Sequence, residues 1–160
     1  SAGGDRMSAE GPGQLLFEFV RHWSRRSTDI DGSGVEQGRL VMATEAVASI
    51  VGRGETATIN AVAHTLGVDQ SGASRMVASA VSAGYLTMTP APSDRRRREA
   101  TVTRSGRTAL RDAHAWQEQV FDELTRDWTQ HRREQFQDAM TDLITRSLGR
   151  HRVSTRNDPV

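Results

Sequence analysis

Two short helical segments separated by a glycine constrain this sequence more than any other feature. Apolar residues recur at helical spacing over residues 58–66, which begin with a threonine suited to cap a helix. Gly67 follows as the stop, and a second helix is predicted from Asp69 or Gln70 to about Ala83. Two short helices around a tight turn that contains glycine are typical of a helix-turn-helix.

Two β-prone segments come directly after this pair and predict a hairpin. Tyr85–Thr89 is one short strand, and Glu99–Thr103 is a second, in which apolar and polar residues alternate. Pro90–Ser93 forces a turn between them. The tip of this hairpin is expected to carry Asp94 and, after it, four consecutive arginines, Arg95–Arg98, called the arginine run below.

The other predicted helices flank this unit. Apolar residues at helical spacing predict helices over residues 14–26, 35–51, 105–128 and 132–148. Only 36% of the 160 residues are apolar, so we expect the outer helices to bury their apolar faces against a second chain. The predicted class is mainly α with a small β-hairpin wing (α+β), a winged helix-turn-helix plus a helical dimerisation region. Its parts are a disordered segment (1–13), dimerisation helices (14–34 and 104–150), the DNA-binding domain (35–103) and a flexible tail (151–160).

Composition excludes several classes of function. The chain has no cysteine, which excludes disulfides, thiol catalysis and thiolate metal sites. No apolar run approaches the roughly 20 residues that span a bilayer, so we expect a cytoplasmic protein without a membrane partner. The five histidines show no metal-ligand spacing, and no nucleophile motif or glycine-rich phosphate loop is present. We therefore expect no metal, no cofactor, no catalytic residue and no enzymatic activity.

Positive charge is concentrated around the helix-turn-helix and the hairpin. The formal net charge is only +1, and every basic residue is arginine. Residues 69–104 hold six arginines and three acidic residues, whereas residues 105–149 hold six arginines and eight acidic residues. The basic segment is where a phosphate backbone would dock.

The second helix and the arginine run carry the chemistry of DNA recognition. Four polar residues face outward on this helix: Gln70, Ser71, Ser74 and Arg75. Gln70 can read adenine and Arg75 guanine bidentately, and the serines suit phosphates or base edges. Any small polar helix start would look similar, so the arginine run decides the interpretation.

Arg95, Arg96, Arg97 and Arg98 repel one another, and folding does not require them. Beside DNA they gain counterion-release free energy, and a narrow minor groove attracts arginine. Asp94 is expected to pair with Arg96 and to hold the tip in shape. The alternative is a solvated charged loop.

Five stretches of this sequence resemble the MarR (multiple antibiotic resistance regulator) family. They are Ala61–Ser71, Ser74–Arg75, Gly84–Leu86, Asp94–Arg96 and Val102–Gly106. The resemblance covers about 45 residues strongly, and the flanking helices match more loosely in length and order. It implies an obligate homodimer on a pseudo-palindromic operator, with the second helix of the pair in the major groove and Arg95 and Arg96 in the minor groove.

The resemblance also implies a small-molecule effector, in many members an anionic phenolic compound bound between the dimerisation helices and the winged domain. Nine residues are candidates for that site: Phe19, His22, Trp23, Arg26, Met42, Glu45, Arg107, Arg111 and Trp116. The alternative, which helical spacing favours for Trp23 and Trp116, is a core position. The absence of cysteine excludes a thiol-oxidation sensor.

The sequence thus predicts a sequence-specific, DNA-binding transcriptional regulator that acts as a homodimer. The favoured form is a repressor that a small, aromatic or phenolic ligand releases from an inverted-repeat operator in double-stranded DNA. The alternative is a DNA-binding architectural or anti-regulatory protein without a small-molecule response. Repressor and activator are not distinguished by these residues, and neither the operator nor the effector is identified by them.

Overall fold

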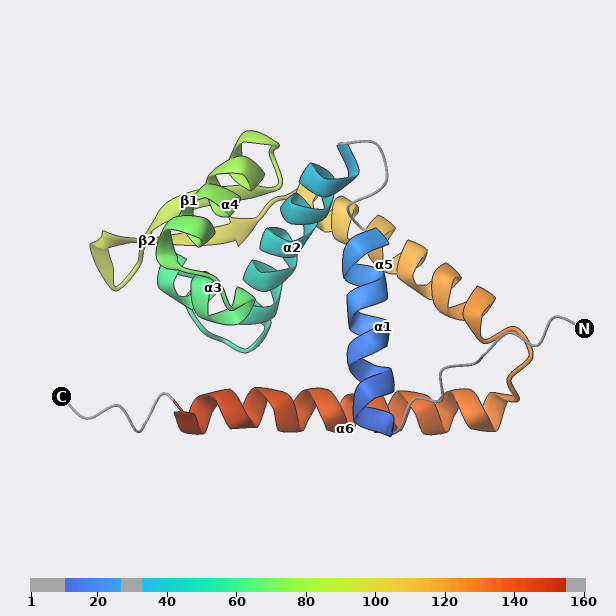
Figure 1. Cartoon of the computed structure of the whole chain (residues 1–160). Helices are drawn as coiled ribbons and strands as arrows, with labels where there is room; N and C mark the ends of the chain where they lie inside the picture. The colour runs from blue at the N-terminus through green and yellow to red at the C-terminus, as the bar shows by residue number, and fades with distance from the viewer. Residues whose placement is uncertain (1–10, 27–32, 155–160) are drawn as a thin grey trace, which may run out of the picture. The chain divides into compact units, whose positions relative to one another are not determined.

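Six helices and one antiparallel hairpin make up residues 11–26 and 33–154, the part of the chain that this computed structural model describes (Figure 1). This confirms the predicted fold class. The elements in order are α1 (Pro12–Arg26), α2 (Ser33–Gly52), α3 (Ile59–Leu66), α4 (Gln70–Ser82), β1 (Leu86–Ala91), β2 (Asp94–Val102), α5 (Arg104–Leu124) and α6 (Gln130–Ser154).

Several boundaries differ from those predicted. Helix α1 begins at Pro12 rather than Gln14, because proline is well tolerated in the first turn of a helix. Helix α6 extends from Gln130 to Ser154, so the predicted tail begins inside a helix. Residues 1–10, 27–32 and 155–160, which include most of the predicted disordered segment and most of the predicted flexible tail, lie outside the described residues.

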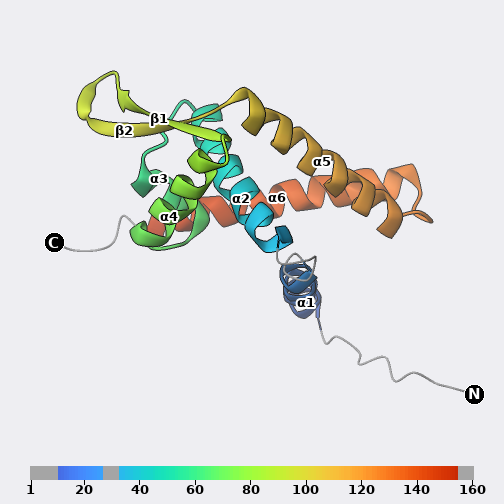
Figure 2. The ribbon, with the colours of Figure 1, turned by 90° about the horizontal axis from the view of Figure 1, so that it is seen from above.

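The chain divides into two compact units, residues 1–113 and 114–160, which are considered separately. In the first, α2, α3, α4 and the hairpin pack on one another around a single core (Figure 2). The largest side chains that are fully buried are Ile50, Leu86, Val47, Val62, Val77 and Thr44. Thr44 is tolerated there because its hydroxyl donates to the Leu40 carbonyl, 2.7 Å away.

Helix α3 has the termini that its sequence predicts. Thr58 is the N-cap, with extended backbone angles, and its hydroxyl accepts from the N–H of Ala61 at 3.2 Å. Gly67 ends the helix with φ of 67°, a left-handed conformation that glycine adopts without strain. These two termini confine α3 to eight residues and turn the chain toward α4.

Helix α4 begins at Gln70, one of the two starts that the sequence left open, and Asp69 is its N-cap. Its Oδ1 accepts from the N–H of Gly72 at 2.8 Å. A Cβ on Gly72 would lie 2.6 Å from that same oxygen, so glycine here leaves space for the cap. The cap fixes the first turn of α4, the turn that carries Gln70 and Ser71.

We expect Asp69→Ala to destabilise the protein by about 1 kcal/mol, because the first turn of α4 loses its side-chain acceptor. Asp69→Asn is the matched control, since asparagine caps helices about as well as aspartate and should leave stability nearly unchanged. Urea denaturation followed by circular dichroism measures both. Equal losses in the two variants would show that the cap is not the source of the effect.

The wing, residues 86–102, is a tight hairpin with one irregularity. Leu86–Pro90 pair in register with Arg98–Val102, but Ala91 pairs with Asp94 across a two-residue turn. The register therefore shifts, and three residues of β2, Arg95–Arg97, have no partner on β1. The N–H of Ala100 also donates to the carbonyl of Ala57 at 2.8 Å, which ties the wing to the segment before α3.

A compact joint connects the wing to α5. The backbone N–H of Thr103 donates to the Tyr85 carbonyl at 3.0 Å, and its hydroxyl donates to the Gly84 carbonyl at 2.5 Å. The same hydroxyl oxygen accepts from the N–H of Gly106 at 3.0 Å. Gly106 is buried against the Tyr85 backbone, so this joint fixes where the wing leaves the helical body.

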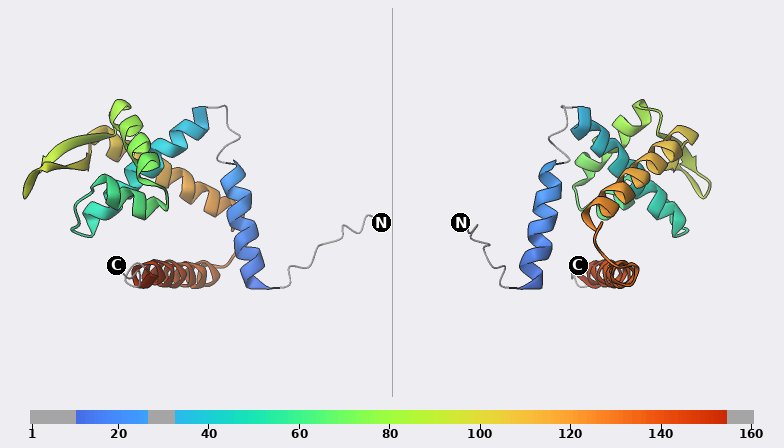
Figure 3. Two further views of the ribbon diagram at one scale, coloured as in Figure 1. Left: turned by 60° about the vertical axis from the view of Figure 1, so that its left-hand side comes forward. Right: turned by 90° about the vertical axis from the view of Figure 1, so that its right-hand side faces the viewer.

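The second unit contains the end of α5 and the whole of α6, which Figure 3 shows as one uninterrupted helix. The rings of Phe121 and Phe136 stack with centroids 5.7 Å apart, and Trp128 meets both edge-on. The guanidinium of Arg133 donates to Asp122 at 2.6 Å and to the carbonyl of Thr125 at 3.0 Å. Helix α5 ends at Leu124, short of the predicted Trp128. None of the helices among the described residues is long and apolar enough to span a membrane.

Candidate nucleic-acid interface

The outward face of α4 is polar and accessible. Its inward face is closed by Ala73, Val77 and Ala80, which are all buried in the core. The four residues predicted to face outward do so, and all are exposed: Gln70, Ser71, Ser74 and Arg75. They lie in the first two turns of the helix. In a helix-turn-helix, side chains near the N-terminus of the recognition helix contact base edges in the major groove.

The wing presents the second polar surface. Figure 2 shows the hairpin extending from the helical body, with its turn at the far end. All four residues of the arginine run, Arg95–Arg98, are exposed. The sequence placed them at the tip of the hairpin, whereas in the structure they lie on β2. Within the described part of the chain, the guanidinium groups of the first three make no hydrogen bond or ion pair with protein. They are free to meet an external anion.

Asp94 stabilises the backbone at this point. Its Oδ1 accepts from the backbone N–H of Arg96 at 3.0 Å. The predicted pairing of the two residues is thus made by the amide of Arg96 and leaves its guanidinium unengaged. An aspartate two residues ahead of its donor is a common turn device, and here it orders the irregular part of β2.

Arg98 differs from its three neighbours. Its Nη2 donates to the carbonyl of Met88 at 3.1 Å, across the hairpin on β1. Arg107 makes a similar contact at the other end of the wing, where its Nη1 donates to the Val102 carbonyl at 2.9 Å. Both guanidinium groups therefore donate to backbone carbonyls of the wing, a role that the sequence did not suggest for either arginine.

The nine residues predicted to line an effector site are spread over α1, α2 and α5. Phe19 and His22 are exposed on α1, and Trp23 is half-buried with its ring centroid 5.9 Å from that of His22. Trp116 is 51% exposed, so it is not a core residue of the chain by itself. The side chain of Arg26 lies outside the described residues.

The remaining four candidates are exposed as well. Met42 and Glu45 lie on α2, and Arg107 and Arg111 lie in the first half of α5. The guanidinium of Arg111 donates to the hydroxyl of Thr108 at 3.1 Å. Of the nine candidates, Met42 alone lines the pocket described next.

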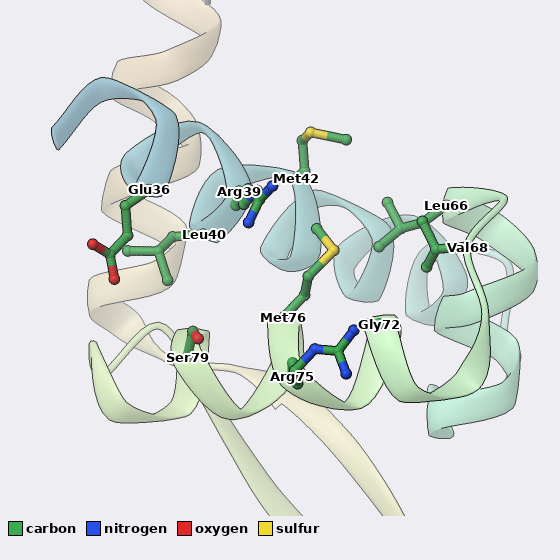
Figure 4. Close-up of a pocket in the computed structure, with 10 residues that line it drawn as sticks. All are labelled: Glu36, Arg39, Leu40, Met42, Leu66, Val68, Gly72, Arg75, Met76 and Ser79. Carbon is green, nitrogen blue, oxygen red and sulfur yellow. The ribbon is translucent and has the colours of Figure 1, made fainter. Parts of the chain in front are cut away.

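A pocket of about 640 Å³ lies between α2 and α4 in the first unit (Figure 4). Its lining is Glu36, Arg39, Leu40, Met42, Leu66, Val68, Gly72, Arg75, Met76 and Ser79. The apolar members come from α2, from the end of α3 and from α4. Sequence reasoning missed Arg39 here, because a single arginine on α2, three residues after Glu36, belongs to no motif that indicates a site.

A comparison with protein families finds one match, in which residues 46–97 fit the MarR family. This segment runs from the second half of α2 through the arginines on β2. It therefore holds every α4 residue predicted to contact DNA and Arg95–Arg97 of the wing. No curated protein sequence matches the chain.

Solved structures with the same fold are numerous, at low sequence identity. A crystal structure of MarR has a TM-score of 0.69 at 22% identity and covers 92% of this chain and 98% of its own. A MarR family transcriptional regulator from Silicibacter pomeroyi has a TM-score of 0.62 at 18% identity, and the match covers 86% of this chain and 90% of that regulator. CouR from Rhodococcus jostii RHA1, solved with p-coumaroyl-CoA bound, has a TM-score of 0.56 at 21% identity. The match covers 81% of this chain and 90% of CouR.

Proposed function

We propose that this chain, whose winged helix-turn-helix is that of the MarR family, is a sequence-specific DNA-binding regulator that represses transcription from an inverted-repeat operator. The observation that carries the proposal is the pairing of two accessible polar surfaces on one unit, α4 and the wing. Helix α4 offers Gln70 and Arg75 for base edges, and the wing offers Arg95–Arg97, whose guanidinium groups have no protein partner among the described residues. In this arrangement α4 supplies the specificity and the wing supplies most of the electrostatic affinity.

We expect Arg75→Ala to weaken binding to the preferred operator by about 1–3 kcal/mol and to relax the preference at one base position of each half-site. The reason is that a guanidinium can bond guanine O6 and N7 together, and alanine replaces neither bond. Fluorescence anisotropy with a set of operators changed one base pair at a time measures the effect. Ser82→Ala, at the exposed end of the same helix, is the matched control and should change neither quantity.

A different result would favour the other class of function. An architectural protein without specific reading would bind operator and random duplex equally, and Arg75→Ala would then weaken both alike. Loss of affinity without any change in base preference would assign Arg75 to phosphate contact. Unchanged affinity in the variant would remove Arg75 from the interface.

We further propose that the regulator is a homodimer, so that two copies of α4 meet the two halves of the operator. Helices outside the core of the winged unit keep large apolar side chains exposed in the single chain. On α1 they include Phe17, which is 64% exposed, and on α6 they include Leu143, Ile144 and Leu148, each about half exposed or more. A second copy would remove this area from water.

Sedimentation equilibrium should give twice the chain mass of 17.6 kDa at micromolar concentration. Leu143→Asp combined with Ile144→Asp should shift the mass toward that of one chain, because both side chains are exposed only while the partner is absent. Exposed polar positions on the same helix, Gln137 and Thr141, provide the control substitutions to alanine. A wild-type protein that sediments as a monomer would contradict the two-half-site model.

We also propose that a small aromatic or phenolic ligand releases the protein from DNA. One structural neighbour, CouR, was solved with p-coumaroyl-CoA bound, which supports a ligand response on this fold. The candidate residues for such a site remain those on α1, α2 and α5. Titration of the protein–operator complex with phenolic carboxylates tests the response, and unchanged DNA affinity across such a set would contradict it.

A further inference from the structure

A single acidic side chain stands at the start of α4, on the surface assigned to DNA. Asp69 is the one acidic residue between Glu55 and Asp94, and it directly precedes Gln70 and Ser71 of the outward face. Its side chain is exposed. Phosphates repel a carboxylate, so the charge of Asp69 does not add to the electrostatic affinity of this surface for DNA.

Helix capping by itself does not require this charge. An N-cap needs an oxygen that accepts from the helix backbone, and serine, threonine and asparagine provide one while remaining neutral. A negative charge adds a small stabilisation from the helix dipole. Helix α3, the other helix of the motif, is capped by the neutral Thr58. The charge of Asp69 is therefore open to a second role.

The cap holds the Asp69 carboxylate in place and leaves part of it free. Its Oδ1 accepts from the N–H of Gly72 at 2.8 Å. A carboxylate has about four acceptor sites on its two oxygens, and this hydrogen bond uses one of them. Among the described residues Asp69 makes no ion pair, and Arg75 on the same helix makes none either. The second oxygen is therefore available to a donor outside the protein.

Only some base edges offer such a donor in the major groove. Cytosine presents its N4 amino group, whereas guanine presents the acceptors O6 and N7, and thymine presents the acceptor O4. Adenine presents its N6 amino group beside the acceptor N7, which repels a second acceptor. A side chain that can only accept therefore favours cytosine and disfavours guanine and thymine.

We propose that Asp69 is a specificity-determining residue, whose carboxylate accepts from the N4 amino group of a cytosine in each half-site. This role rests on the proposed function, because it requires α4 in the major groove. Arg75 comes six residues after Asp69, which is roughly 9 Å of helix at about 1.5 Å per residue. Base pairs stack about 3.4 Å apart, so the two side chains read different base pairs.

The variants that separate base reading from capping are Asp69→Asn and Asp69→Ser, since both keep a capping oxygen and should be nearly as stable as the wild type in urea. Each full chain selects bound duplexes from a pool with a randomised core. The wild type should enrich cytosine at one position of each half-site, distinct from the position that Arg75→Ala relaxes. Asp69→Asn should move this preference to a purine, whose N7 accepts from the amide, and Asp69→Ser should lose it without replacement.

Fluorescence anisotropy with selected duplexes that differ only at the cytosine position measures the size of the effect. Guanine in place of cytosine should weaken binding by the wild type about tenfold and should not weaken binding by Asp69→Asn. This variant should also bind random duplex more tightly than the wild type, because a charge that repels phosphates is gone. Asp127→Asn, in the exposed turn between α5 and α6, removes the same charge outside α4 and the wing and should change neither quantity.

The outcomes distinguish the role of Asp69 from the proposed function. A selected inverted repeat whose base preferences are the same in the wild type and in Asp69→Asn would overturn the role of Asp69 and leave the function intact. Equal changes in Asp69→Asn and Asp127→Asn would assign the effect to net charge and would overturn it as well. Recovery of no common sequence by the wild type would contradict the proposed function, and base reading by Asp69 with it.

Discussion

Gly106→Ala is expected to lower the free energy of unfolding by about 3 kcal/mol, at the upper end of the usual cost of overpacking. A Cβ on residue 106 would overlap the carbonyl oxygen of Tyr85 and would lie 2.9 Å from Cγ1 of Val102. The overlapped atom is backbone, so no rotamer change relieves it. That carbonyl also accepts from the N–H of Thr103, so the substitution strains the joint between the wing and α5.

Gly38→Ala is the matched control. Gly38 is also helical, and nothing lies within 4 Å of a Cβ built there. Alanine should stabilise this helix by about 0.5–1 kcal/mol, because it lowers the conformational entropy of the unfolded chain. Urea denaturation at one fixed protein concentration measures both variants, since the stability of a dimer depends on concentration. Equal stability of the two variants would contradict the packing described at the joint.

Replacing Arg95 and Arg96 by alanine together is expected to cause the largest loss of DNA affinity. Neither guanidinium has a protein partner among the described residues, and both lie in the part of β2 without a partner strand. Each lost phosphate contact lowers the slope of log K against log salt concentration by about 0.9, so the double variant loses about 1.8 per protomer. Affinity should fall for operator and random duplex alike, because these contacts carry no base identity.

Arg126→Ala with Arg146→Ala is the matched control, since it removes the same charge from exposed positions outside the wing. Its salt slope should stay near that of the wild type. A similar loss in the control would show that net charge, rather than the wing, determines binding. An unchanged slope in the Arg95 and Arg96 variant would remove the wing from the interface.

Arg98→Ala should behave differently from its neighbours, because the wild-type side chain already bonds the Met88 carbonyl. The substitution removes a hydrogen bond within the wing rather than a contact with DNA. This distinction could not be drawn from four identical residues in a row. It depends on the register shift between Pro90 and Ala91. The shift pairs Arg98 with Pro90 of β1 and leaves Arg95–Arg97 without a paired residue on that strand.

Local signals in the sequence were sufficient for the helix-turn-helix. Thr58 and Gly67 are the cap and the stop of α3, as predicted, and α4 begins at Gln70, one of the two starts that the sequence left open. Strand ends were less predictable. The wing strands are longer than predicted, because pairing across a two-residue turn extends them beyond the alternating residues.

Contacts between distant segments could not be predicted in this way. The pairing of Ala57 with Ala100 and the burial of Gly106 against Tyr85 depend on how the hairpin folds back on the helices. The α2–α4 pocket depends likewise on tertiary packing that brings Arg39 near Arg75, which are far apart in sequence. Exposed apolar residues on α1 and α6 were anticipated from low apolar content, because a single chain offers them little to pack against.

Selection of bound duplexes from a random pool by the wild-type chain tests most directly whether α4 and the wing together read DNA. We expect enrichment of an inverted repeat whose half-sites lie about one helical turn, roughly 10 base pairs, apart. The same selection with Arg75→Ala should lose one conserved base position in each half-site. Recovery of no common sequence from the wild-type protein, at a salt concentration where it binds DNA, would contradict sequence-specific binding by α4 and the wing.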